Sequence, residues 1–253
     1  MRELILKELK RIEEQEDVRI LMAVESGSRA WGFASPDSDY DVRFIYVRPA
    51  EEYLRLNKVR DVIEVPVNDV LDINGWDIDK MLRLLYKSNP TLFEWASSPV
   101  VYLDNGLRDR ILPLLPKYFY AKRGLYHYLS MAKSNYREYL KGDMVKAKKY
   151  FYVIRPLLAC KWILDKNSPP PMLFSKLMEA ELDPAVKPEV DRLLDLKMNE
   201  PERKLIPKVD AVNNYMDRCI REIEEKLNQL PDCPQNDWNE LNSLFLEIIG
   251  YHA

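Results

Sequence analysis

Two aspartates one residue apart, Asp39 and Asp41, form the arrangement in this sequence that most clearly predicts chemistry. The run YDVRFIYV (residues 40–47) is rich in β-branched and aromatic residues and predicts a strand. Side chains alternate along a strand, so both carboxylates point to the same face. Two carboxylates that close repel each other unless a cation lies between them. Oxygen ligands of this kind suit Mg²⁺ or Mn²⁺, so the pair predicts a divalent metal site.

A Gly-Ser turn, Gly27-Ser28, lies ten residues before the aspartate pair and follows the strand-like run VRILMAVE (residues 18–25). The residues after it, SRAWGFA, predict a short helix. A turn between a strand and a helix offers backbone N–H groups and a hydroxyl to a phosphate. Arg29 would add a cation to the same anion. A simple polar turn is the competing interpretation of SPDSDYD, but the combination favours a metal held between a phosphate and the aspartates.

The stretch GSRAWGFASPDSDYDVRFIYV (residues 27–47) resembles the signature of the DNA polymerase β-like nucleotidyltransferase superfamily. Residues 72–102 resemble one branch of it, the predicted nucleotidyltransferases of bacteria and phages, some of which are associated with RNA ligase and RNA repair. The resemblance to this branch covers most of residues 20–165. It implies that Asp39 and Asp41 bind metals and that a third carboxylate, on a later strand, activates the attacking hydroxyl.

The third carboxylate has five candidates in the sequence: Asp61, Glu64, Asp69, Asp72 and Asp77. DVIEVPVNDVLDI predicts a hairpin whose second strand covers about residues 69–73, with Asp72 near its end. The resemblance also points to Asp72. Asp69 and Asp77 are the alternatives, although Asp77 equally suits the start of a helix as its cap.

The reaction implied by the resemblance is in-line attack of an acceptor hydroxyl on the α-phosphorus of an NTP, expected to be ATP, with release of pyrophosphate. Gly27 and Ser28 would hold the β- and γ-phosphates, and Asp72 would serve as metal ligand and general base. An RNA 3′ end is the favoured acceptor, and an RNA ligase is an expected partner. A protein hydroxyl (AMPylation) fits the same site. Outside catalysis, the alternative is a nucleotide sensor or antitoxin-like protein.

The chain changes character near residue 118, which predicts a nucleotidyltransferase catalytic domain at 1–117 and a helical domain at 118–253. The expected class is α+β, a nucleotidyltransferase-type mixed β-sheet with flanking helices followed by an all-α domain. Strands are predicted within residues 18–25, 40–47, 61–67, 70–73 and 100–103, and later helices at about 121–141, 144–165, 172–181, 187–198, 208–230 and 236–249.

The middle of the chain is basic, since residues 121–165 contain ten Lys or Arg against three Asp or Glu. Lys148, Tyr152 and Arg155 lie at i, i+4 and i+7 and so share a helix face, which we expect to contact the nucleotide. The competing interpretation is a solvated face over an aromatic core. The aromatic residues of this segment are Tyr126, Tyr128, Tyr136, Tyr139, Tyr150, Phe151, Tyr152 and Trp162.

Composition predicts a cytoplasmic protein that does not enter the membrane. The 253 residues are 47% hydrophobic but contain no apolar run of 18 or more. The three cysteines, Cys160, Cys219 and Cys233, are far apart in the sequence, which argues against a zinc site or a disulfide framework.

Overall fold

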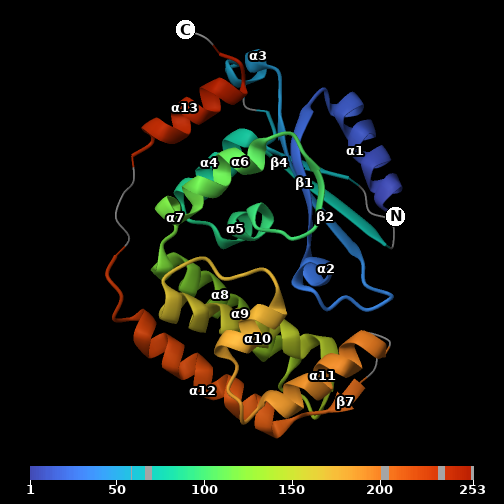
Figure 1. Cartoon of the computed structure of the whole chain (residues 1–253), viewed down its shortest axis with the longest axis vertical. Coiled ribbons are helices and arrows are strands. Elements are labelled where there is room, and N and C mark those ends of the chain that lie inside the picture. Colours follow the sequence, from blue (N-terminus) through green and yellow to red (C-terminus); the bar gives the residue numbers. More distant parts are fainter. Residues whose placement is uncertain (58, 66–69, 201–204, 233–236, 252–253) are drawn as a thin grey trace. The chain divides into compact units, whose positions relative to one another are not determined.

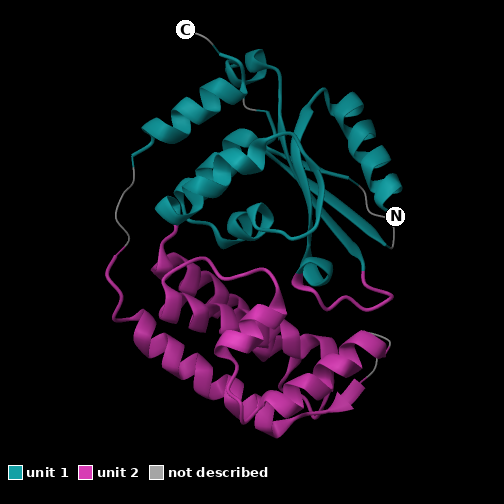
Figure 2. Ribbon diagram, in the orientation of Figure 1, with its two compact units in different colours: residues 1–30, 39–118, 235–253 teal, residues 31–38, 119–234 magenta. Residues whose placement is uncertain are grey.

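The computed structural model describes residues 1–57, 59–65, 70–200, 205–232 and 237–251 (Figure 1). The chain divides into two compact units, coloured separately in Figure 2. The first contains residues 1–30, 39–118 and 235–253, and the second contains residues 31–38 and 119–234. Among the described residues, no helix combines the length and apolar character needed to cross a membrane.

The first unit is built on a five-stranded mixed sheet in the order β3-β4-β2-β1-β5. Its strands are β1 (Arg19–Ser26), β2 (Tyr40–Val47), β3 (Val62–Glu64), β4 (Leu71–Asp77) and β5 (Val101–Asp104). β2 and β4 are parallel, and the other neighbouring pairs are antiparallel. This sheet, with its flanking helices, confirms the predicted α+β class.

Helices cover both faces of this sheet (Figure 1). On one face, α1 (Arg2–Glu16) buries Ile5, Leu9 and Ile12, which recur at helical spacing, in one core with alternate residues of β2 and β4. On the other face, Trp76 of β4 stacks on Trp95 of α5 with ring centroids 3.7 Å apart. The remaining elements of the unit are α2 (Gly27–Trp31), α3 (Ala50–Tyr53), α4 (Ile78–Tyr86), α5 (Pro90–Ala96), α6 (Leu107–Ile111), the 3₁₀ turn η1 (Leu112–Leu114) and α7 (Leu115–Tyr118).

The last helix, α13 (Asn239–Ile248), belongs to the first unit rather than to the helical one. The sequence predicted this helix but grouped it with residues 118–253. Just before the helix, the Trp238 ring stacks on Tyr86 at 3.7 Å, and Phe245 meets Tyr53 edge-on at 5.1 Å. Contacts between residues far apart in the sequence decide to which unit α13 belongs. Helical periodicity predicts the helix but not these contacts.

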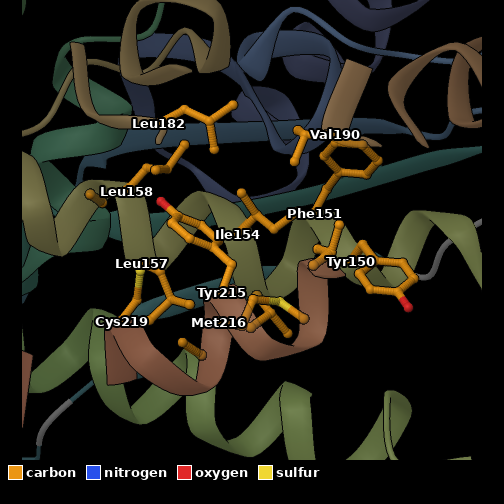
Figure 3. Close-up of a cluster of buried hydrophobic side chains, with 14 of the residues drawn as sticks. Tyr150, Phe151, Ile154, Leu157, Leu158, Leu182, Val190, Tyr215, Met216 and Cys219 are labelled. Atoms are coloured by element: carbon orange, nitrogen blue, oxygen red, sulfur yellow. The ribbon is translucent and has the colours of Figure 1, made fainter. Parts of the chain in front are cut away.

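The second unit is a bundle whose central helix is α9 (Ala147–Lys166). Figure 3 shows Phe151, Ile154 and Leu157 of α9 packed with Tyr215 and Met216 of α12. The helix continues through Pro156. The other elements are α8 (Ala121–Tyr139), α10 (Phe174–Glu181), α11 (Lys187–Asn199), α12 (Asp210–Leu227) and an unpredicted antiparallel ribbon of β6 (Met144–Lys146) and β7 (Leu205–Pro207).

Candidate active site

The first residues of β2 and β4 bring two of the predicted carboxylates side by side. The parallel register pairs Asp41 with Asp72, and Asp39 immediately precedes β2. Val42 and Ile73 face the α1 core, so Asp41 and Asp72 project from the opposite face of the sheet. The expectation that Asp72 lies near the end of its strand was wrong, because β4 begins at Leu71. Parallel pairing puts this beginning beside the beginning of β2.

Arg43 bridges the two paired aspartates. Its Nη2 lies 3.2 Å from Asp41 Oδ1 and 2.7 Å from Asp72 Oδ2, and its Nη1 donates to the Asp72 carbonyl at 3.2 Å. Two neighbouring carboxylates repel, and a guanidinium between them stabilises both charged forms. Its place between the carboxylates shows that this part of the sheet favours a positive charge.

The three aspartates interact electrostatically. Burial raises the pKa of Asp41 above its usual range, Arg43 opposes that shift, and the charges of Asp72 and Asp39 raise the pKa further. Across the described parts of the chain, no three His, Cys, Asp or Glu residues are already arranged around a metal position. The donor chemistry fits Mg²⁺ or Mn²⁺, since all three groups are carboxylates and two of them, Asp41 and Asp72, already hold the Arg43 guanidinium.

Gly27, the first residue of α2, allows the chain there to approach the carboxylate of Asp41 closely. Its φ is +63°, and a Cβ built on it would lie 2.1 Å from Asp41 Oδ2. Any larger residue would therefore meet both an unfavourable backbone conformation and a direct overlap with the carboxylate. The Gly27-Ser28 turn and the aspartate pair are thus parts of one local structure, although ten residues separate them in the sequence.

Arg29 connects that turn to the residues just before β2. Its Nε donates to the Asp39 carbonyl at 3.0 Å, and its guanidinium lies 3.7 Å from the centroid of the Tyr40 ring. The charge of Arg29 also lowers the pKa of Asp41. Arg29 therefore supplies positive charge at this site and supports the backbone that carries Asp39, and its contact with a phosphate stays a prediction.

The family model RlaP, described as an RNA repair pathway DNA polymerase beta family, matches residues 1–247 of the chain. The chain belongs to the RlaP family. The uncharacterized protein YcgL of Bacillus subtilis (strain 168) is 45% identical over 251 residues, which are 98% of this chain and 96% of that protein. A nucleotidyltransferase-like protein from Exiguobacterium sibiricum 255-15, of known crystal structure, matches with a TM-score of 0.33 and 13% identity, over 87% of this chain and 73% of that one.

RlaP membership confirms the predicted resemblance to the DNA polymerase β-like nucleotidyltransferases of RNA repair. It supports a nucleotidyltransferase as the class of enzyme. Family membership does not say which residues of this chain are catalytic or which acceptor it uses.

The structure separates Asp72 from the other candidates for the third carboxylate. Asp61 pairs with Lys80 at 3.1 Å, and Glu64 pairs with Arg60. Asp77 lies at the far end of β4, where it accepts the Asp79 N–H at 2.9 Å and caps α4. Asp69 lies outside the described residues. Of the candidates that the structure describes, Asp72 is the one paired with Asp41.

Sequence reasoning missed Glu25, a fully buried carboxylate at the end of β1. Its Oε1 accepts the Asp41 backbone N–H at 2.7 Å, and its Oε2 accepts the Tyr102 hydroxyl. Burial raises the pKa of Glu25, against which the two hydrogen bonds act. A buried carboxylate is costly unless it is hydrogen-bonded. The sequence could have indicated a positioning role for Glu25, because a glutamate within the apolar run RILMAVES is unusual.

A second missed feature is a buried cluster that includes Ser38, the residue just before Asp39 in the sequence. Lys197 of α11 places its Nζ 2.9 Å from Ser35 Oγ and 3.1 Å from Ser38 Oγ, and the two hydroxyls are 2.8 Å apart. All three side chains are buried. Ser38 directly precedes Asp39, so the cluster restrains the backbone that leads into the aspartate pair. No local pattern relates Lys197 to serines some 160 residues earlier.

The predicted helix face on α9 has a mixed environment. Arg155 is buried, with its guanidinium 4.5 Å from the Trp31 ring and its Nη2 3.6 Å from Met172 Sδ. Lys148 and Tyr152 are half-buried on the same helix. Nucleotide contact by these two residues stays a prediction, whereas Arg155 lies within the packed interior of its own unit.

The aromatic residues of the basic segment are mostly part of the core. Tyr128, Tyr150 and Phe151 are buried, and Tyr150 holds its hydroxyl 3.0 Å from Asn213 Oδ1. These rings have no free face on which a base could stack. Tyr126 differs, because 54% of it is exposed.

Proposed function

We propose that this chain transfers a nucleoside monophosphate from an NTP, expected to be ATP, to the 3′-hydroxyl of an RNA, with Mg²⁺ or Mn²⁺ as cofactor. The observation that carries the proposal is the parallel pairing of Asp41 with Asp72 beside Gly27, in a member of an RNA repair nucleotidyltransferase family. Two carboxylates paired across neighbouring strands, a third just before one of those strands and a Gly-Ser segment beside them are parts that such a transfer can use.

The proposed roles follow from what each side chain contacts. Asp39, Asp41 and Asp72 would hold the cation, which when bound would neutralise triphosphate charge and lower the pKa of the acceptor hydroxyl. Gly27 and Ser28 would offer backbone N–H groups and a hydroxyl to the β- and γ-phosphates. The single charge of Arg43 offsets part of the negative charge of Asp41 and Asp72, and a bound divalent cation would offset more of it.

The proposed step forms one bond and breaks one. The acceptor oxygen attacks the α-phosphorus, the bond from this phosphorus to the α–β bridging oxygen breaks, and pyrophosphate leaves. The acceptor proton would pass to Asp72, whose side chain is 39% exposed and so within reach of a substrate. Glu25 would hold the Asp41 backbone in place from behind, through its 2.7 Å hydrogen bond.

The test is incubation of the purified chain with Mg²⁺ or Mn²⁺, each of the four α-³²P-NTPs and a short single-stranded RNA that ends in a 3′-hydroxyl. We expect label on the RNA, and loss of that label in Asp41→Asn and Asp72→Asn. Asp61→Asn is the matched control, because Asp61 is an exposed carboxylate of the same unit that pairs with Lys80. The same RNA with a 3′-phosphate should remain unlabelled.

Other outcomes would point to the alternatives. Label on protein and not on RNA would replace the RNA acceptor with a polypeptide hydroxyl. Metal-dependent NTP binding without any transfer would favour the nucleotide sensor. Equal labelling by wild type and Asp41→Asn would refute the assignment of the site. Association with an RNA ligase stays a prediction, which co-purification with a ligase from the source cell would test.

A further inference from the structure

A groove of about 770 Å³ runs between α8 and α12, entirely within the second unit. Its volume lies in the range of sites that bind small or extended ligands. It involves none of the carboxylates of the proposed active site, and no residue that the sequence assigned to the nucleotide lines it.

One side of the groove is a polar stripe along α8. Its members follow one another at helical spacing and therefore share a face. They are Tyr126, Ser130, Lys133, Ser134 and Arg137, with Lys141 just beyond the end of the helix. At 1.5 Å per residue, the stripe extends about 17 Å from Tyr126 to Arg137. Its exposed groups are cations, hydroxyls and a phenol ring.

The carboxylates of the opposite side, on α12, are already engaged. Glu224 pairs with Lys133, and Asp217 Oδ2 accepts the Tyr136 hydroxyl at 3.0 Å. Within the described part of the chain, neither Arg137 nor Lys141 pairs with a carboxylate. The groove therefore has two cations that remain available to an anion.

Two of the three aliphatic residues that line the groove, Leu129 and Leu227, are already buried, and the third, Ile220, is half-buried. Leu129 is 5% exposed and Leu227 is 4% exposed, so an incoming protein helix would gain little apolar contact there. By contrast, Tyr126 is 54% exposed. Free cations at one end of the groove and an exposed aromatic ring about 17 Å away along α8 suit a single strand, whose phosphates bind cations and whose bases stack on aromatic rings.

We propose that this groove binds single-stranded RNA, and thereby holds the acceptor by nucleotides that do not react. Arg137 and Lys141 contact backbone phosphates, and Tyr126 stacks a base. The inference rests on the proposed function for the identity of the ligand as RNA. The groove supplies the sequence-tolerant part of acceptor binding, which is separate from NTP binding at the carboxylates.

The test is fluorescence anisotropy of a 5′-labelled 12-nucleotide RNA at several salt concentrations, with the full-length chain. The double variant Arg137→Ser/Lys141→Ser should bind more weakly, and the slope of log K against log salt should become shallower by roughly 1.4, at about 0.7 per phosphate contact. Tyr126→Ser should weaken binding roughly tenfold, as expected for loss of one stacked base, and leave the slope unchanged.

The matched control is Lys176→Ser/Arg221→Ser, which removes one lysine and one arginine from exposed positions of the same unit outside the groove. This variant should bind RNA as wild type does. If it weakens binding as much as the groove variant, or if the groove variant binds like wild type, the proposal is overturned. A wild-type chain that does not bind the RNA also overturns it.

Metal-dependent NTP binding and labelling of the RNA are measured in parallel, so that the two proposals can fail separately. If RNA binding depends on the groove but no nucleotide is transferred, the groove proposal is supported and the proposed reaction is refuted. If the chain transfers nucleotide to RNA but Arg137→Ser/Lys141→Ser leaves the KM for RNA unchanged, the proposed reaction is supported and the groove proposal is refuted.

Discussion

Replacement of Gly27 by alanine tests whether the turn and Asp41 form one site. The added Cβ would lie 2.1 Å from Asp41 Oδ2, and contacts between real atoms of these types need more than 3.0 Å. The carboxylate must therefore retreat by roughly 1 Å, or the turn must move away from it. A displacement of about 1 Å at a reacting centre can reduce the rate of reaction on the order of 100-fold.

The same substitution also strains the backbone, because φ at Gly27 is +63°. A left-handed conformation costs an alanine about 1–2 kcal/mol relative to glycine. This penalty would lower the free energy of unfolding whether or not the site has a function. A control is needed that carries the backbone penalty without the clash.

Gly106 provides that control in the same unit. Its φ is +85°, and a Cβ built on it meets nothing within 4 Å. Gly106→Ala should therefore lower the free energy of unfolding by about 1–2 kcal/mol and leave transfer unchanged. Gly27→Ala should destabilise at least as much and reduce transfer on the order of 100-fold.

The assay combines urea unfolding with labelling of a short RNA from α-³²P-NTP at several Mg²⁺ concentrations. Loss of transfer in Gly27→Ala, with Gly106→Ala unaffected, would support a site that depends on the close approach of the turn. If the two variants transfer equally well, the turn does not act together with Asp41 and the reasoning fails.

Three further predictions concern other parts of the molecule. Arg43→Met removes the cation between the two aspartates, so Tm in EDTA should fall and Mg²⁺ should raise it more than in wild type, as measured by thermal unfolding. Lys197→Met should reduce the transfer rate about tenfold through misplacement of the backbone before the aspartate pair, with Tm changed by only a few degrees, because the two serine hydroxyls still pair with each other. Burial raises the pKa of Asp77 to about 6 from its usual 3.8, so protonation favours the folded state. The stabilisation of the folded state by protonated Asp77 is complete below pH 3.8 and is lost as the pH rises through 6. Between pH 4 and 7.5, the free energy of unfolding measured in urea should therefore fall in wild type by at most about 3 kcal/mol more than in Asp77→Asn.

Each of these predictions has a matched control. Arg83→Met removes an exposed ion pair with Asp79 and should leave the Mg²⁺ response unchanged. Lys176→Met changes an exposed lysine of the second unit and should leave transfer unchanged. Asp61→Asn should follow the wild-type pH dependence. An Arg43→Met protein with no greater response to Mg²⁺ than wild type would argue against a metal site at the aspartates.

Most of the local structure could be predicted from the sequence. The β-branched and aromatic residues of YDVRFIYV predicted β2, and helical periodicity predicted α8 to α13 with differences of a few residues at their ends. Such patterns are readable because neighbours in the sequence share one strand or one helix face. The Gly-Ser turn and the spaced aspartates were sufficient for the resemblance that RlaP membership confirms.

Tertiary structure alone decided how these pieces combine into a site. Asp72 lies beside Asp41 because β4 joins the sheet in parallel to β2, and no local pattern distinguishes parallel from antiparallel pairing of a short strand. The bridge by Arg43, the support from Glu25 and the anchoring of the serines by Lys197 follow from that packing. Each of these three contacts joins residues that are far apart in the sequence and is weak by itself. They form only when the whole core is assembled.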